Sequence, residues 1–282
     1  MKVLKVINNN IISSIDESNR EIVVMGRGLG YGRKPGEVID ENKIEKIFRM
    51  DSSGDVRVLE NLLTDVPLEI VQLVNEIIDS AEKQIEDKLQ KSIYITLIDH
   101  IYFAIERKRQ NILFQNALFY DVKRLYKKEY RIGKEAVTHI NEVLEIDLPE
   151  EEAVAIALHF INARLGKEMP ETITITRIVQ NTIKIVQYYY NMELVEDILE
   201  ADYFILHVKQ LAERALGNAM LKTRDEDLED LVRVKFPKAS ECAKRITDYI
   251  FKEYGIEITS AEATDLTIKI ERVSTQHESE KQ

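Results

Sequence analysis

Two histidines occupy equivalent positions in this sequence, each seven residues before an arginine. The segments "IDHIYFAIER" and "ILHVKQLAER" place His100 ahead of Arg107 and His207 ahead of Arg214. Seven residues make about two helical turns, so each histidine and its arginine share one face of a helix. An arginine on that face can respond to a change of charge on the imidazole by pairing or by repulsion. The pattern therefore favours a charge-dependent role.

Other uses of these side chains remain open. A lone histidine in an apolar helix is often a hydrogen-bonded core residue, and an arginine often forms an ordinary ion pair. We expect no metal site and no cofactor, because no His or Cys pair has the close spacing of zinc ligands. No nucleophile-base motif is present, so we expect no enzyme. His139 and His277 have no repeat partner and are interpreted as surface or tail residues.

A second pair of segments extends the repeat. "IDLPEEEAVAIALHFI" aligns with "IEITSAEATDLTIKIE" at an offset of 110 residues, which places Lys269 opposite His159. Pro149 and three acids open a helix in the first segment, and Thr259 with Glu262 forms a plausible capping box in the second. The sequence therefore predicts two equivalent helical modules.

Glycine is concentrated near the N-terminus, where five of the ten glycines fall within residues 26–36. We expect a mobile loop whose backbone can approach a phosphate or a base. Arg27 can pair or stack, Tyr31 offers a ring, and Asn8 and Asn10 offer amide groups. A glycine-rich hairpin loop with ordinary cations and turn-forming asparagines is the alternative. A dinucleotide-binding fingerprint is excluded because no helix begins on the last glycine.

The first fifty residues read as short strands. Runs rich in β-formers cover 2–7, 10–15 and 20–25, the stretch 43–50 is ambiguous between a helical turn and a last strand, and 51–55 reads as a linker. Such a unit has a thin core, so we expect it to need a partner surface, most simply a second copy of itself.

Helical periodicity follows from about residue 58. Ile70, Leu73, Ile77 and Ile78 lie on one face of a helix predicted over 68–85, with Pro67 at its start. We expect interruptions at four residues: Gly133, Pro149, Gly166 and Pro170. The fold class is α+β multidomain, with a small antiparallel β domain before two homologous all-α helical bundles. The expected domains are 1–56, 57–170 and 171–282.

Charge and hydropathy narrow the class of protein. Residues 1–35 carry six Lys and Arg against three acids, whereas the whole chain has a net charge of -11. This mildly basic head permits nucleic-acid binding without indicating it. Neither an export signal nor a run of about 18 apolar residues is present, so we expect a cytoplasmic protein without membrane insertion. The single Cys242 excludes an intramolecular disulfide framework.

Taken in order, "KVINNN…VVMGRGLGYG", "DHIYFAIER" and "LPEEEAVAIALHF" resemble the transcriptional antiterminators of sugar-utilisation operons, whose members respond to β-glucosides or sucrose. The resemblance spans essentially the whole chain. It implies a co-antiterminator domain that binds a hairpin in leader mRNA as a homodimer, which prevents a terminator from forming. It further implies two regulation domains of the sugar phosphotransferase system (PTS).

The resemblance also implies residue roles. The expected RNA-binding residues are Lys5, Asn8, Asn10, Gly26, Arg27 and Tyr31. The expected phosphorylation sites are His100, His159 and His207, supported by Asp99, Arg107 and Arg214. The implied partners are the phosphocarrier protein HPr and a sugar-specific enzyme II of the PTS. Phosphorylation of the second module by HPr would stimulate antitermination, and phosphorylation of the first module by the enzyme II would inhibit it.

One departure concerns the second module, where members of the family usually have a histidine and this chain has Lys269. A lysine keeps its positive charge and cannot accept phosphate in place of the histidine. Three alternatives remain: activation needs only His207, control through this module is weakened, or Lys269 acts as a fixed cation that attracts a phosphate on His207. Two further classes stay open: a histidine phosphotransfer relay and a PTS-regulated activator that binds DNA. The strand-rich head argues against a DNA-binding helix-turn-helix.

Overall fold

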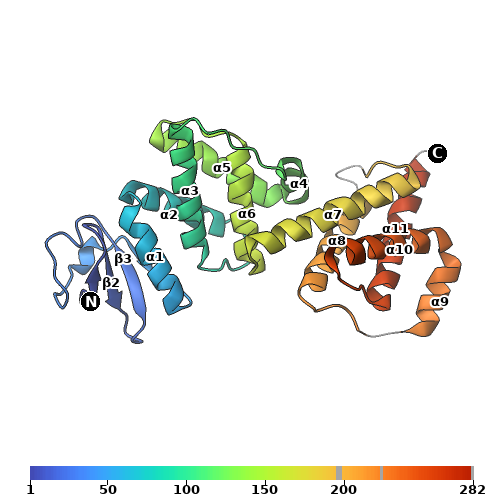
Figure 1. The fold of residues 1–282 in the computed structure, drawn as a ribbon, viewed down its shortest axis with the longest axis horizontal. Coiled ribbons are helices and arrows are strands. Elements are labelled where there is room, and N and C mark those ends of the chain that lie inside the picture. The colour runs from blue at the N-terminus through green and yellow to red at the C-terminus, as the bar shows by residue number, and fades with distance from the viewer. Residues whose placement is uncertain (195–198, 223–224, 281–282) are drawn as a thin grey trace. The chain divides into compact units, whose positions relative to one another are not determined.

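The computed structural model describes residues 1–194, 199–222 and 225–280 (Figure 1). Two compact units make up the chain, Met1–Met169 and Pro170–Gln282. The first unit holds a β-sheet and a group of helices, and the second is helical. Within the described part of the chain, no helix is both long and apolar enough to cross a membrane. The α+β class expected from the sequence is confirmed.

A four-stranded antiparallel sheet forms the N-terminal part, with its strands in chain order. The strands are β1 (Lys5–Val6), β2 (Ile11–Ile15), β3 (Glu21–Met25) and β4 (Lys46–Phe48). The predictions for β2 and β3 are confirmed. The strand predicted over 2–7 is present but shorter, since β1 covers only Lys5–Val6 and Lys2 makes an isolated bridge with Val38. The ambiguous stretch divides into a 3-10 turn, η1 (Glu41–Lys43), and then β4.

One face of the sheet is closed by the loops of the same region. Successive side chains of a strand point to opposite faces. Ile12, Ile22 and Val24 therefore share a face, where they form a buried cluster with Val3, Leu29 and Ile39. The glycine-rich segment supplies Leu29, so it is anchored by an apolar side chain as well as by its backbone.

Helix α1 (Ser53–Asp65) covers the opposite face of the sheet. Ile11, Val23, Met25 and Phe48 alternate with the first cluster and are all buried. The linker predicted over 51–55 is wrong, because the Ser52 hydroxyl accepts a hydrogen bond from the Asp55 amide at 3.1 Å and caps the helix. The face that we expected to need a second copy is thus filled by a helix of the same chain.

The rest of the first unit is a helical bundle. Its helices are α2 (Leu68–Glu82), α3 (Ile93–Arg109), α4 (Phe119–Leu125), α5 (Lys127–Leu144) and α6 (Glu151–Leu165). Gly166 ends α6 with a φ of 64°, as the predicted interruption requires. The interruption predicted at Gly133 is wrong: this glycine lies inside α5, where a Cβ would stand 2.1 Å from the Ala153 carbonyl oxygen of α6. It lets two helix backbones approach closely.

The second unit repeats this arrangement. Its helices are α7 (Met169–Tyr190), α8 (Leu199–Leu216), α9 (Glu226–Lys235), α10 (Pro237–Tyr254) and α11 (Ser260–Glu280). Helix α3 packs on α6 in the first unit as α8 packs on α11 in the second. His100 and His207 therefore lie on corresponding helices, as do His159 and Lys269. The repeat inferred from the sequence is a structural one.

Candidate functional site

Two loops of the β region are held together by hydrogen bonds. The amide of Gly26 donates to the carbonyl oxygen of Asn10 at 2.9 Å, and that of Gly28 donates to the Asn10 side-chain oxygen at 2.8 Å. The side-chain oxygen of Asn8 in turn accepts from the Asn10 amide at 2.9 Å. The asparagine loop and the glycine loop therefore form one structured edge, which brings together three of the six expected RNA-binding residues.

Close packing explains two of the glycines in this edge. A Cβ on Gly26 would stand 1.9 Å from the Lys43 carbonyl oxygen, and one on Gly30 would stand 2.3 Å from that of Asn8. At these two positions the absence of a side chain permits contact between backbones within the protein. The backbone amide of Gly26 donates its hydrogen bond to Asn10 within the protein.

The side chains expected to bind RNA differ in what they contact. Arg27 and Tyr31 are exposed, with 74% of Tyr31 accessible to solvent. Lys5 and Asn8 instead contact α1: the Lys5 amine lies 2.8 Å from the Glu60 carboxylate, and the Asn8 amide donates to the Leu63 carbonyl oxygen at 2.8 Å. Helix α1 thus occupies polar groups of two expected RNA-binding residues.

A buried carboxylate organises the histidines of the first unit. Glu152 at the start of α6 lies 2.9 Å from Arg107 and 3.0 Å from Nε2 of His100, both on α3. The ring of His159 has its centroid 4.9 Å from that of His100. Helices α3 and α6 therefore bring the two histidines and Arg107 together, as the sequence suggested, around an acid that it had not singled out.

Burial sets the charge states of this cluster. Burial lowers the pKa of His159 to about 3, and the neighbouring His100 acts in the same direction. Burial alone would raise the pKa of Glu152, but contacts with His100 and Arg107 outweigh it, so this pKa is lowered. At neutral pH the cluster holds a carboxylate and a neutral His159, whose Nδ1 is buried without a hydrogen-bond partner.

A cavity of about 640 Å³ opens on this cluster. Asp99, His100, Arg107 and His159 line it, which brings the expected supporting residue Asp99 to the same place. Val58 and Leu62 of α1 also line the cavity. The same helix thus contacts the histidine cavity through these apolar side chains and the sheet through Glu60 and Leu63.

The second unit has a corresponding cluster with different pairing. Arg214 of α8 donates to both carboxylate oxygens of Glu262, at 2.7 Å and 2.6 Å, and the Leu221 amide donates to the same group at 2.9 Å. His207 does not share this acid; its Nδ1 lies 3.6 Å from a carboxylate oxygen of Asp265. The capping box expected for α11 is only half formed, since the Glu262 side chain binds Arg214.

A cavity of about 410 Å³ lies beside His207. Lys269 and Arg272 line it together with His207. Burial lowers the pKa of His207, and Lys269 and Arg214 also lower it, against an opposite effect of Asp265. The lysine that departs from the expected histidine therefore faces the same cavity as the remaining histidine of its unit.

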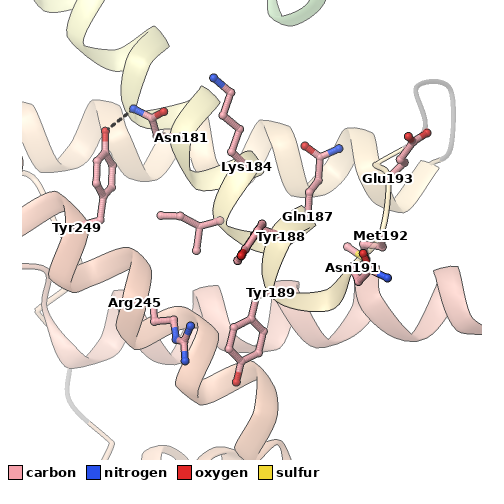
Figure 2. Close-up of a pocket in the computed structure, with 11 residues that line it drawn as sticks. Asn181, Lys184, Gln187, Tyr188, Tyr189, Asn191, Met192, Glu193, Arg245 and Tyr249 are labelled. Carbon is pink, nitrogen blue, oxygen red and sulfur yellow. Dashed lines mark hydrogen bonds between the residues drawn. The ribbon is translucent and has the colours of Figure 1, made fainter.

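A larger groove in the second unit lies apart from these residues. It has a volume of about 1240 Å³ and is lined mainly by α7 and α10 (Figure 2). Asn181 donates to the Tyr249 hydroxyl at 2.7 Å, and the Arg245 guanidinium lies 4.8 Å from the Tyr189 ring centroid. Its lining contains none of the residues to which the sequence gave a role.

Comparisons with known proteins identify the two kinds of region. The CAT RNA binding domain family matches residues 1–56, and the PRD domain family matches residues 75–163 and 180–273. The chain belongs to the CAT–PRD antiterminator family. Its CAT match contains the paired loops, and its two PRD matches contain the two histidine clusters.

Two proteins named as antiterminators match this sequence over nearly its full length. Transcription antiterminator LicT of Bacillus subtilis (strain 168) is 44% identical over 97% of this chain and 99% of its own length. The Beta-glucoside operon antiterminator of Dickeya chrysanthemi is 43% identical over 97% of this chain and 96% of its own length. A crystal structure of GlcT CAT-PRDI covers 58% of this chain and 97% of that chain, with 33% identity and a TM-score of 0.51.

Sequence reasoning missed the pairing of a buried carboxylate with an arginine in each PRD domain. Glu152 and Glu262 occupy the same position of the repeat, 110 residues apart, and each lies 1% exposed or less. The repeat was the available signal, because an acid kept at equivalent positions opposite a repeated arginine points to a pair. His139, by contrast, lies 2.8 Å from Glu76 and is exposed, in line with its expected surface role, and the side chain of His277 lies outside the described residues.

Replacing Glu262 with Gln is expected to lower the free energy of unfolding of the second PRD domain by about 3 kcal/mol. The change leaves Arg214 without its charge partner, and breaking a buried pair costs more than breaking an exposed one. Arg233→Gln is the matched control: its pair with Asp230 is exposed on both sides, so about 0.5 kcal/mol or less is expected. Urea unfolding measures both, and equal losses would contradict a structural role for the buried pair.

Acid is expected to destabilise the first PRD domain through His159. The pKa of this residue is about 3 in the folded chain against 6.5 when unfolded, so stability is complete above pH 6.5 and is lost as pH falls toward 3. Between pH 7 and pH 5 the loss is about 2 kcal/mol. Glu152, whose pKa is lowered from 4.5, contributes only below that window.

The variant His159→Gln is expected to remove this loss between pH 7 and pH 5. His139→Gln, which changes an exposed histidine of the same domain, serves as the control and should keep it. Denaturant unfolding at the two pH values measures the difference. Equal losses in the wild type and in His159→Gln would show that this ring is not buried in its neutral form.

Proposed function

We propose that this chain is an RNA-binding transcription antiterminator whose CAT region, residues 1–56, binds a hairpin of leader mRNA and so prevents a terminator from forming. The structured edge built by the asparagine and glycine loops carries the proposal, because it presents Arg27 and Tyr31 to solvent on a CAT sheet. The two most similar proteins described above are named as antiterminators.

The residues at this edge suit folded RNA. Hairpins are recognised through loops, distorted pairs and backbone, which calls for cations, amide groups and a planar group for stacking. Arg27 offers a guanidinium for a phosphate or a base, and Tyr31 offers a ring. Lys5, Asn8 and Asn10 would add an amine and two amides. Gly26, whose amide donates to Asn10, would contribute by holding the two loops of the edge together. Both Lys5 and Asn8 would first exchange their contacts with α1.

We further propose that the RNA-bound form is a homodimer. The sheet face with Ile11, Val23, Met25 and Phe48 is apolar and suited to stacking on a second copy. In the single chain α1 covers that face, so this mode of pairing would require α1 to move away. The operon would be one for sugar utilisation, and the similarity to the Beta-glucoside operon antiterminator supports β-glucosides as the sugars.

Phosphorylation by the PTS would set the proportion of chains in which α1 covers the sheet and of chains that pair as a dimer. The acceptors would be His100 and His159 in a domain spanning 57–170, and His207 in a domain spanning 171–282. A phosphoryl group on His100 would compete with Glu152 for Arg107, because two anions cannot share one guanidinium without repulsion. Since Val58 and Leu62 of α1 line that cavity, a rearrangement there would reach the helix that holds Lys5.

The partners would be HPr for the second PRD domain and a sugar-specific enzyme II for the first. The chain would act as a regulator in the cytoplasm, where transcripts are made, and not as an enzyme or a relay to a small molecule. A DNA-binding activator is disfavoured because the sheet-forming head leaves no helix-turn-helix within residues 1–50.

Transcription in vitro through the leader of the chain's own operon tests the function. Added protein is expected to increase readthrough of the terminator and to bind the leader RNA in the same concentration range. A duplex DNA of the same sequence is the control and should not bind. Binding to the DNA without readthrough would favour the activator and overturn the proposal.

A further inference from the structure

The cavity beside His207 combines two cations with a histidine that is nearly buried. Lys269 and Arg272 lie three residues apart on α11, so they share one face of that helix. His207 reaches the same cavity from α8 and is 7% exposed. A third cation, Arg214, is already taken by Glu262. Lys269 and Arg272 are therefore the cations that the cavity offers to an anion.

Among the residues that the structure describes, one nitrogen of His207 has no hydrogen-bond partner. Its Nδ1 lies 3.6 Å from the Asp265 carboxylate, whereas its Nε2 is buried and makes no hydrogen bond. A buried polar atom without a partner is costly and asks for an explanation, such as a group that binds there. The acid beside Nδ1 favours a proton on that nitrogen, which leaves the lone pair of Nε2 available.

The first PRD domain shows what Lys269 replaces. There the corresponding residue of α6 is His159, whose ring lies 4.9 Å from that of His100, and no lysine lines the cavity. The first cluster therefore pairs two possible acceptors, whereas the second pairs one acceptor with a fixed cation. The difference lies at the centre of the site and not at its rim.

We propose that the cavity beside His207 is a seat for a single phosphoryl group, in which Lys269 and Arg272 pair with a phosphate carried on Nε2 of His207. The proposal rests on the proposed function, which makes His207 a phosphorylation site. It removes the three-way choice left by the sequence: Lys269 is the counter-ion of the phosphohistidine. A phosphoryl group carries about -1.5 to -2 charges, which the two cations offset, whereas Glu200 adds one negative charge to the lining of the same cavity.

Transfer of the phosphoryl group to His207 needs no reactant other than the donor phosphohistidine. The lone pair of His207 Nε2 attacks the phosphorus of a donor phosphohistidine, a new N–P bond forms, and the donor N–P bond breaks with its electron pair returning to the donor imidazole. The proton on Nδ1 of His207 stays in place beside Asp265. The product imidazolium faces an acid on one side, and its phosphate faces two cations on the other.

Phosphorylation of the full chain with phosphoramidate tests the seat. In this reaction the P–N bond of the reagent breaks and ammonia leaves. Mass spectrometry of peptides gives the number of phosphates on residues 180–273, the second PRD match, which excludes His277, and the decay of phospho-His207 at pH 7 gives its lifetime. We expect one phosphate in the wild type, about fivefold faster decay in Lys269→Gln and Arg272→Gln, and near wild-type decay in Lys269→Arg. Fivefold corresponds to about 1 kcal/mol.

Two further variants complete the comparison. Lys252→Gln removes an exposed cation of α10 in the same domain and should leave the lifetime unchanged. Lys269→His should raise the number of phosphates in the domain from one to two. If Lys269→Gln, Arg272→Gln and Lys252→Gln all decay at the wild-type rate, the seat is wrong while His207 remains an acceptor. If no variant carries phosphate at His207, both this proposal and the sensing role fail.

Discussion

A fragment of residues 1–56 is expected to bind the leader hairpin as a dimer, and more tightly than the unphosphorylated full chain does. The fragment lacks most of α1, so the sheet face with Ile11, Val23, Met25 and Phe48 is left without its cover. Stacking on a second copy restores the burial of that face, and burial of apolar surface is worth about 25 cal/mol per Å². Sedimentation and gel-shift measurements report the two properties.

A longer fragment separates the effect of α1 from that of the PRD domains. Residues 1–66 keep α1 and with it the contacts of Glu60 and Leu63 with Lys5 and Asn8. This fragment is expected to remain more monomeric and to bind the hairpin more weakly than 1–56. Equal dimerisation and equal affinity of the two fragments would show that α1 does not compete with the partner sheet or with the RNA.

Within the short fragment, Arg27→Gln is expected to reduce RNA affinity by about tenfold to a hundredfold, since a guanidinium contact with RNA is worth about 1–3 kcal/mol. Arg20→Gln is the matched control, because Arg20 pairs with Asp16 in the turn between β2 and β3. This substitution also removes one positive charge, but at a site distant in sequence from the asparagine and glycine loops. Failure of 1–56 to bind any structured leader would remove the function assigned to the CAT region.

The difference between the expected and the observed sheet region has a physical cause. The strands β2 and β3 follow β-propensity and turn residues, which act locally, and both were predictable. Helix α1 was not recognised at its start, because Ser52 and Gly54 also suit a turn and only the Ser52 cap and the apolar sheet decide for a helix. Gly133 was misread for the same reason, since its use depends on the helix that packs against it.

The residues of the candidate site could be predicted where the same spacing occurs in both modules. They could not be predicted where a residue also had a role within its own helix. The repeated spacing located His100 with Arg107 and His207 with Arg214. Glu152 and Glu262 lie in the first turns of their helices, where acids stabilise the helix N-terminus, so a local explanation seemed sufficient. Their pairing with arginines is a contact between distant helices that no single segment contains.

The second expected result concerns the three histidines. With a reconstituted phosphocarrier system, the wild-type full chain is expected to take up acid-labile phosphate, and a variant with His100, His159 and His207 all replaced by Gln is expected to take up none. Phosphate on nitrogen is labile in acid, so the label itself identifies the type of bond. His139→Gln is the matched control, because its ring is exposed and pairs with Glu76 outside both clusters.

The same preparation tests whether the label reaches the RNA-binding edge. Phosphate on His100 would add negative charge to a ring whose Nε2 now lies 3.0 Å from the Glu152 carboxylate, and the cavity wall that must respond includes Val58 and Leu62 of α1. Because α1 also holds Lys5 through Glu60, RNA affinity is expected to change in the wild type on phosphorylation and to stay constant in the triple variant. Unchanged labelling in the triple variant would contradict the proposal that these histidines sense the PTS. Labelling of the wild type without any change in RNA affinity would keep the phosphorylation sites but contradict the role of α1 as the connection between the two sites.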